Sequence, residues 1–256
     1  MSKLTTLLTF YRTPQKFSSR AKILKIQQKR MLKHVKEIRR KSKFFARLWD
    51  GYADDDWKNF PITDKEMMMS NLQDYLTEDL DVEFAREIAL NAEKSRDFTQ
   101  KLDGYSVGFS SGTTGARGMH IVSEYEQDKW SGYMMARGLD GSIFGRHNIG
   151  LFLRANSNTY ENVGSRKIKF HFFDLIKPMD ELVENLLTTD LDILIAPPSV
   201  LRYLADNGVE LKLRRIVSSA EVLTQVDKNV IEQHFGQIVH QFYSSTEGEI
   251  AATCEL

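Results

Sequence analysis

The sequence predicts an α/β protein whose mixed, largely parallel sheet is flanked by helices and preceded by a helical N-terminal region. Between residues 105 and 242, short apolar runs alternate with segments of helical periodicity. This alternation is typical of parallel strands joined by helices. At 256 residues and 41% hydrophobic content, the chain can bury a sizeable core. We therefore divide it into a mostly helical region, residues 1–100, and an α/β region, residues 101–256.

The first long element is a basic amphipathic helix over residues 18–48. Apolar side chains recur on it at helical intervals, at Leu24, Met31, Val35, Ile38 and Phe45. Residues 1–47 hold fifteen Lys or Arg and one acid, although the net charge of the whole chain is zero. We expect the helix to pack through its apolar stripe. Alternatively, the helix contacts an anionic surface or is part of an organelle presequence. Because the segment lacks interleaved aromatic residues, no nucleic-acid partner is expected.

An acidic connector, Trp49 to Pro61, follows this helix. Thr63 and Glu66 have the spacing of a capping box, which predicts a short helix through Leu72. A further helix is predicted over residues 79–100. Its expected core positions are Phe84, Ile88 and Leu90.

The α/β region starts at Gly104. Strands are predicted at residues 105–109, 119–122, 149–154, 168–173, 191–196, 213–218 and 238–242. Helices are predicted at residues 124–139, 178–187, 199–206 and 225–235. Ligands of such sheets gather beyond the carboxyl ends of the strands. Two polar clusters lie at such ends, Ser218 to Glu221 and Tyr243 to Glu247.

The segment from Ser110 to Gly118 lies between two of the predicted strands and reads Ser-Ser-Gly-Thr-Thr-Gly-Ala-Arg-Gly. Glycines let backbone N–H groups converge on an anion, and hydroxyls and a guanidinium add donors. The composition also suits an ordinary turn, and the spacing matches neither a Walker loop nor a dinucleotide fingerprint. The second polar cluster favours the phosphate loop. There Tyr243 offers a flat face to a purine, Thr246 a phosphate donor, and Glu247 an oxygen ligand for Mg²⁺.

The loop together with Tyr-Ser-Ser-Thr-Glu resembles the motifs of the adenylate-forming superfamily, which includes acyl-CoA synthetases, peptide-synthetase adenylation domains and luciferases. The sequence is most similar to the phenylacetate–CoA ligase-like branch, and within it to the group related to coenzyme F synthetase. The likeness runs from about residue 44 to the end. Further stretches that carry it are residues 60–65, 152–158, 196–201 and 220–254.

The resemblance implies a large N-terminal domain of an ATP-dependent adenylate-forming enzyme, with ATP, Mg²⁺ and in some members CoA as ligands. The expected reaction activates a small-molecule carboxylate as an acyl-adenylate, followed in some members by thioester formation with CoA, or transfers an adenylyl group to a hydroxyl of a coenzyme. Thr246 would contact the α-phosphate, Arg117 the phosphates, and Glu247 the magnesium. Ala220, Glu221 and Tyr243 would form the adenine site. The residues expected to hold the β- and γ-phosphates are Ser110, Ser111, Gly112, Thr113, Thr114, Gly115 and Gly118.

Two departures from the family pattern matter. Many members carry Pro-Lys where this chain has Ala116-Arg117, which keeps the charge but changes its geometry. The chain also stops at Leu256, before the positions of the family's ribose-binding aspartate, hinge and C-terminal domain with its catalytic lysine. We expect a fragment, or a truncated form that lacks full catalysis. A non-catalytic nucleotide- or phosphate-binding module is the alternative.

The composition indicates the cellular compartment that we expect for the protein. No run of about 18 apolar residues predicts a transmembrane helix. The single cysteine, Cys254, excludes an intramolecular disulfide and fits a reducing compartment. The N-terminus lacks the apolar core of a signal peptide. We therefore expect a cytoplasmic protein, and the sequence does not indicate its oligomeric state.

Overall fold

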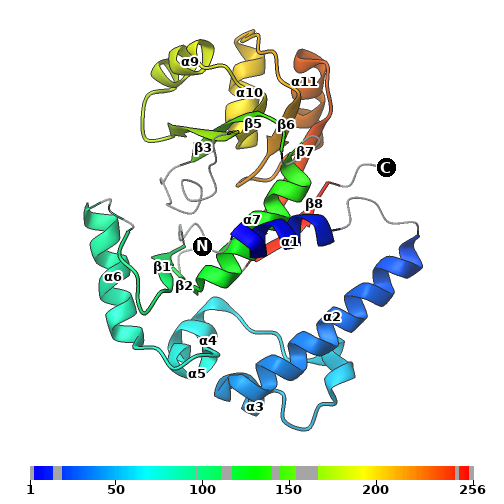
Figure 1. Ribbon diagram of the computed structural model, residues 1–256, viewed down its shortest axis with the longest axis vertical. Coiled ribbons are helices and arrows are strands. Elements are labelled where there is room, and N and C mark those ends of the chain that lie inside the picture. The colour runs from blue at the N-terminus through cyan, green and yellow to red at the C-terminus, as the bar shows by residue number, and fades with distance from the viewer. Residues whose placement is uncertain are drawn as a thin grey trace. The chain divides into compact units, whose positions relative to one another are not determined.

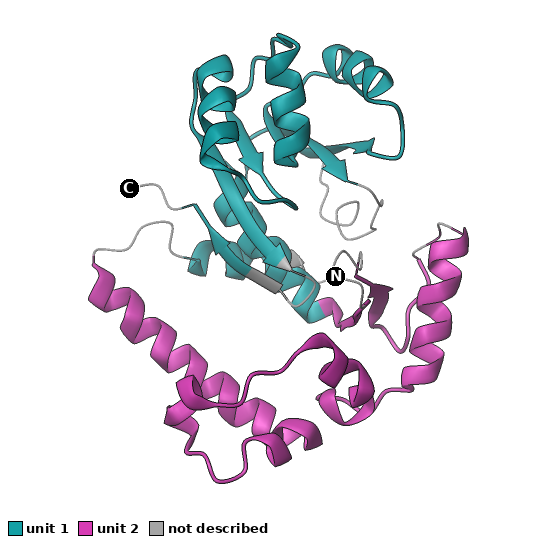
Figure 2. Cartoon of the chain, turned by 180° about the vertical axis from the view of Figure 1, so that it is seen from behind, with its two compact units in different colours: residues 1–15, 125–256 teal, residues 16–124 magenta. Residues whose placement is uncertain are grey.

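The computed structural model describes residues 3–13, 19–95, 97, 99–110, 117–139, 144–153, 167–245 and 248–253. Figure 1 labels the helices and strands in chain order. The chain divides into two compact units (Figure 2). Unit 1 consists of residues 1–15 and 125–256, and unit 2 consists of residues 16–124.

Unit 1 is built on a six-stranded sheet with the strand order β4-β3-β5-β6-β7-β8. Strands β3 to β7 pair in parallel, and β8 pairs antiparallel with β7. This confirms the predicted mixed, largely parallel sheet. The strands are β3 (His147–Leu153), β4 (Ile168–Asp174), β5 (Ile193–Ala196), β6 (Arg215–Ser218), β7 (Val239–Ser245) and β8 (Gly248–Ala252). The helices are α1 (Lys3–Arg12), α7 (Glu124–Gly138), α9 (Met179–Thr188), α10 (Pro198–Asp206) and α11 (Gln225–Phe235).

Helices cover both faces of the sheet in unit 1. Neighbouring residues of a strand point to opposite faces, so each strand contributes to two cores. Leu194 of β5 and Ile216 of β6 lie in a core with buried residues of α9, α10 and α11. Ile193 and Val217, their neighbours in sequence, lie in a second core with buried residues of α7 and with Phe10 of α1. Because helices cover both faces of the sheet, the residues that point to either face are apolar, and the central strands read as continuous apolar runs.

Helix α1 was not predicted from the sequence. Phe10 is buried, and Gly132 of α7 lies where α1 passes closest. A Cβ atom on Gly132 would stand 2.6 Å from the Thr6 carbonyl oxygen and 2.7 Å from Thr9 Cβ. Glycine at this position therefore lets the two helices approach.

Unit 2 is mainly helical and ends in a β-hairpin. The predicted helix over residues 18–48 is two helices, because Ser42 interrupts it with φ −94° and ψ 118°. Its hydroxyl accepts from the Phe45 N–H (3.3 Å), which caps the second helix, and donates to the Asp74 carbonyl (2.9 Å). The elements of unit 2 are α2 (Arg20–Lys41), α3 (Lys43–Leu48), the 3₁₀ helix η1 (Asp54–Asn59), α4 (Lys65–Ser70), α5 (Leu72–Tyr75), α6 (Val82–Ser95), β1 (Ser106–Phe109) and β2 (Met119–Val122).

The predicted capping box at Thr63 is wrong by one position. Asp64 is the N-cap of α4, and its carboxylate accepts from the Met67 N–H at 2.8 Å. An aspartate is at least as good an N-cap as a threonine.

The buried face of α6 also differs from the prediction. Ile88 is buried as expected, at 1% exposure, but Phe84 is 46% and Leu90 42% exposed. The face that packs on the core consists of Val82, Ala85, Ile88, Ala89 and Ala92. Alanines carry much of this face, so a pattern read from large apolar residues selected the wrong side.

The division into units does not fall at residue 100. Leu102, Val107 of β1 and Met119 of β2 share one core with Ile88 of α6. The hairpin therefore belongs with the helical unit, and residues 101–124 join unit 2.

Candidate functional site

The proposed phosphate loop closes the hairpin of β1 and β2, whose last register pair is Phe109 with Met119. Two hydrogen bonds join the ends of the loop. The Ser110 N–H donates to the Gly118 carbonyl (2.8 Å), and the Gly118 N–H donates to Ser110 Oγ (2.9 Å). Ser110 is buried. Its hydroxyl thus holds the base of the loop together.

The inner loop residues Ser111, Gly112, Thr113, Thr114 and Gly115 lie outside the described residues. Their assignment to the phosphates stays a prediction.

Arg117 makes three kinds of contact at the base of the loop. Its Nε donates to the Ser110 carbonyl at 3.1 Å. Its terminal nitrogens donate to both carboxylate oxygens of Glu93 on α6, with Nη1 at 3.0 Å from Oε2 and Nη2 paired with Oε1. The guanidinium carbon lies 5.0 Å from the centre of the Phe109 ring. The hydrogen bonds to Glu93 raise the pKa of Arg117 above its ordinary value.

A cleft of about 330 Å³ in unit 2 adjoins Arg117, and three of its lining side chains are basic. The lining residues are Lys65, Glu66, Met69, Ser70, Arg86 and Arg117. Two of the three cations are paired with carboxylates outside the lining, Arg117 with Glu93 and Arg86 with Glu83.

The predicted adenine wall lies just beyond the carboxyl end of β6. Ala220 is exposed and has a φ of 69°, a left-handed conformation that costs a non-glycine residue energy. The Glu221 carboxylate accepts from the Ser199 N–H at the start of α10 (3.2 Å). The negative side chain therefore stabilises a helix N-terminus, which carries a partial positive charge.

Tyr243 lies at the equivalent level of the neighbouring strand. Ser218 of β6 pairs with Gln241 of β7, so Ala220 and Tyr243 each follow two residues later at the same end of adjacent strands. Tyr243 is 63% exposed, and the register with β8 shifts between it and Ser244. Such an irregularity re-aims side chains at functional edges. The ring is therefore available to a ligand beside the Ala220 turn.

The remaining predicted residues, Thr246 and Glu247, lie outside the described part of the chain. Within that part, no group of three or more His, Cys, Asp or Glu side chains could hold a metal ion. The assignment of magnesium to Glu247 therefore rests on the sequence.

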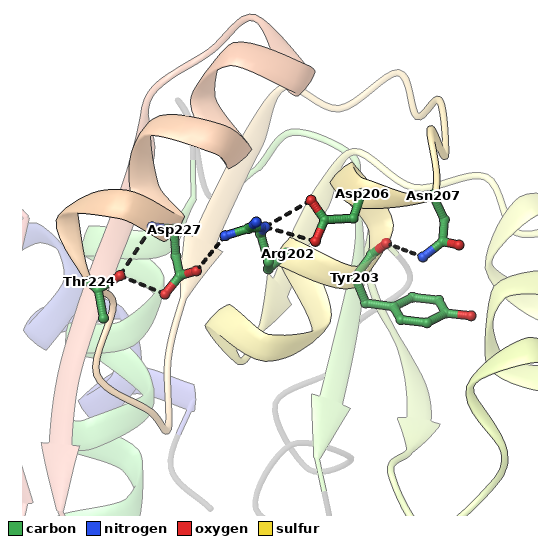
Figure 3. Close-up of polar contacts among 6 residues, drawn as sticks. All are labelled: Arg202, Tyr203, Asp206, Asn207, Thr224 and Asp227. Carbon is green, nitrogen blue, oxygen red and sulfur yellow. Dashed lines mark hydrogen bonds and ion pairs between the residues drawn. The ribbon is translucent and has the colours of Figure 1, made fainter.

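A polar network joins α10, which carries Ser199, to α11 (Figure 3). Arg202 of α10 donates through Nε to both Asp206 oxygens (2.8 Å each) and through Nη1 to Asp227 of α11 (2.9 Å). Thr224, the N-cap of α11, accepts from the Asp227 N–H (3.1 Å) and donates to its carboxylate (2.6 Å). The network links α10 to the first turn of α11.

Sequence reasoning missed two members of the site. Glu93 and Phe109 hold the Arg117 guanidinium, but neither belongs to the loop motif. Glu93 is 24 positions away from Arg117. No local pattern in the sequence signals this pairing.

No family model matches the sequence, and a comparison with curated proteins finds no match. Among the described residues, none of the helices combines the length and the apolar character needed to cross a membrane.

The fold is shared with solved structures of 2-hydroxyisobutyryl-CoA ligase. An open conformation in complex with 2-HIB-AMP and CoA matches with a TM-score of 0.64 and 15% identity, over 91% of this chain and 52% of that one. The thioesterification state matches with a TM-score of 0.64 and 15% identity, over 94% and 55%. This chain thus spans about half the length of these structures. It shares the fold of that ligase over this part of the ligase chain.

Proposed function

We propose that the chain is the nucleotide-binding part of an ATP-dependent adenylate-forming enzyme. The observation that carries the proposal is the closed base of the Ser110–Gly118 loop within this fold. The exposed Tyr243 ring beside the strained Ala220 turn supports it further. The solved ligase with this fold holds an acyl-adenylate and CoA.

In this proposal each side chain has one task. The loop binds the β- and γ-phosphates through Ser111, Thr113, Thr114 and the glycine N–H groups. Tyr243 stacks on the adenine, against a wall formed by Ala220 and Glu221. Thr246 donates to the α-phosphate. Stabilising phosphate charge in a partly desolvated site is the main contribution of the protein.

The reaction is attack of a substrate oxygen on the α-phosphorus. A new O–P bond forms, the bond between the α-phosphorus and the bridging oxygen breaks, and pyrophosphate carries away the electron pair. Magnesium, when bound, offsets charge on the phosphates. The Glu247 carboxylate is an oxygen ligand of the type that this ion binds together with substrate phosphates.

The finer assignment is the phenylacetate–CoA ligase-like branch related to coenzyme F synthetase. It rests on the sequence motifs quoted above. With this assignment, the group that attacks ATP is a small carboxylic acid or a hydroxyl of a coenzyme. CoA is an optional second substrate, and the protein acts in the cytoplasm.

Isotope exchange tests the proposal. The protein, offered Mg-ATP and a panel of small carboxylic acids, is expected to incorporate labelled pyrophosphate into ATP. For the 256 residues alone we expect Mg-ATP binding with little turnover, because they span about half the length of the solved ligase with this fold. Mg-ATP binding by the whole protein without exchange on any acid would favour the non-catalytic module instead.

A further inference from the structure

The carboxylate of Glu93 lies where a phosphate-binding loop would be expected to exclude negative charge. It is in the last turn of α6, next to the helix C-terminus, which carries a partial negative charge. A carboxylate beside a polyphosphate also repels it. Arg117 offsets both effects through its paired hydrogen bonds to Glu93. The Glu93 side chain is 35% exposed and the Arg117 side chain is 44% exposed, so solvent weakens the ion pair without removing it.

The Arg117 guanidinium is fixed in orientation as well as in charge. It is planar and carries five N–H donors. Described residues engage three of them, namely Nε with the Ser110 carbonyl and one N–H of each terminal nitrogen with Glu93. The Phe109 ring lies under the same group at 5.0 Å. A lysine could not make this set of contacts, because an ammonium has no planar fork.

We propose that Glu93 is a positioning residue of the phosphate loop. It holds Arg117 so that the guanidinium braces the Ser110 end of the loop and turns its other two donors to the phosphates of the nucleotide. Arg117 in turn neutralises Glu93, so that the loop base presents no net negative charge. The inference deepens the proposed function and rests on it for the identity of the ligand.

A double-mutant cycle tests the pair in the 256-residue chain, with the dissociation constant of Mg-ATP measured by calorimetry. Arg117→Gln should weaken binding at least about tenfold, because it removes donors and uncovers the Glu93 charge. Glu93→Gln should weaken binding about threefold, less than Arg117→Gln does, because Arg117 loses its fixed orientation but keeps its charge and its Ser110 contact. Adding Glu93→Gln to Arg117→Gln should restore at least about threefold of the lost affinity, because the uncovered carboxylate is gone.

The positioning role has a separate readout that does not depend on ATP. The Arg117 Nε–Hε group, identified by the signal that Arg117→Gln removes, should give a slowly exchanging NMR signal in the unaltered chain. Glu93→Gln should speed its exchange with water. The matched control is the ion pair of Lys41 with Glu78 in the same unit (2.7 Å, 30% and 46% exposed). Lys41→Gln and Glu78→Gln should alter neither the signal nor the affinity.

Two results would overturn the proposal. The first is a double variant that binds Mg-ATP as weakly as Arg117→Gln. The second is an Arg117 Nε–Hε signal unchanged by Glu93→Gln. Absence of Mg-ATP binding by the unaltered chain would contradict the proposed function and the ligand, and the NMR signal would then still decide whether Glu93 positions Arg117.

Discussion

At the scale of single residues, Ala220 is the most informative position of the described site. Its φ of 69° is unfavourable for a residue with a Cβ atom, and the residue lies directly after a buried strand. Backbone strain persists only where the surrounding structure holds it, and it often marks a ligand site. Here the Ser219 N–H donates to the Ala196 carbonyl at 3.1 Å, and Glu221 is bonded to Ser199. The neighbours on both sides of Ala220 are thus anchored.

Relieving this strain should raise stability. Ala220→Gly is expected to increase the free energy of unfolding by up to about 1 kcal/mol, because glycine adopts positive φ without the steric cost. Urea denaturation measures the change. Gly236→Ala is the mirror control, since Gly236 caps α11 at φ 64° with open space around it. It should lower stability by about 1 kcal/mol. A stability loss in Ala220→Gly would show that the backbone there is not strained.

Asp227 should make folding sensitive to acid. The hydrogen bond from Thr224, and then Arg202, lower its pKa below the ordinary value. The folded state therefore binds a proton less readily than the unfolded state. The stabilisation is present above the unfolded-state pKa of about 3.9 and is lost as the pH falls through the lower folded-state value.

The test compares unfolding of the parent chain and Asp227→Asn between neutral pH and acid. The variant should be less stable at neutral pH, and its deficit should shrink below about pH 4. Asp55→Asn is the control, because Asp55 has no hydrogen bond or ion pair with the other described residues. A deficit that stays constant down to the lowest pH would contradict the account.

At the scale of elements, α6 both supports the loop hairpin and supplies Glu93. Its buried face is built on Ile88 and alanines, and it packs on Val107 and Met119 of the hairpin. Small side chains let the helix approach the two strands closely. The position of Glu93 near Arg117 therefore depends on this packing.

Truncations on the two faces of α6 should differ strongly. Ile88→Ala is expected to cost about 2–4 kcal/mol, because the side chain is 1% exposed and its loss leaves a cavity. Leu90→Ala should change stability by less than about 0.5 kcal/mol, because Leu90 is 42% exposed. Urea denaturation at neutral pH measures both. Equal costs would contradict the assignment of the buried face.

At the scale of the whole molecule, the sheet could be predicted because its central strands are continuous apolar runs between turn residues. The two strands that flank the Ser110–Gly118 segment could be predicted because apolar runs end at its glycines and hydroxyls, while its assignment to phosphates stays a prediction. Helix α1 could not, because it is short and depends on its close approach to Gly132. The pairing of Glu93 with Arg117 depends on how α6 packs on the hairpin, which no local pattern encodes.

The central proposal is that this chain binds Mg-ATP, with the phosphates assigned to the Ser110–Gly118 loop and the adenine assigned to the residues at the ends of β6 and β7. Hydrogen–deuterium exchange with and without Mg-ATP tests it most directly, because a bound ligand slows the openings that let amides exchange. Mg-ATP should slow exchange in residues 106–122, 215–223 and 239–245, and magnesium pyrophosphate should slow it in residues 106–122 alone. Unchanged exchange in all three segments, or slowing confined to other parts of the chain, would contradict the claim.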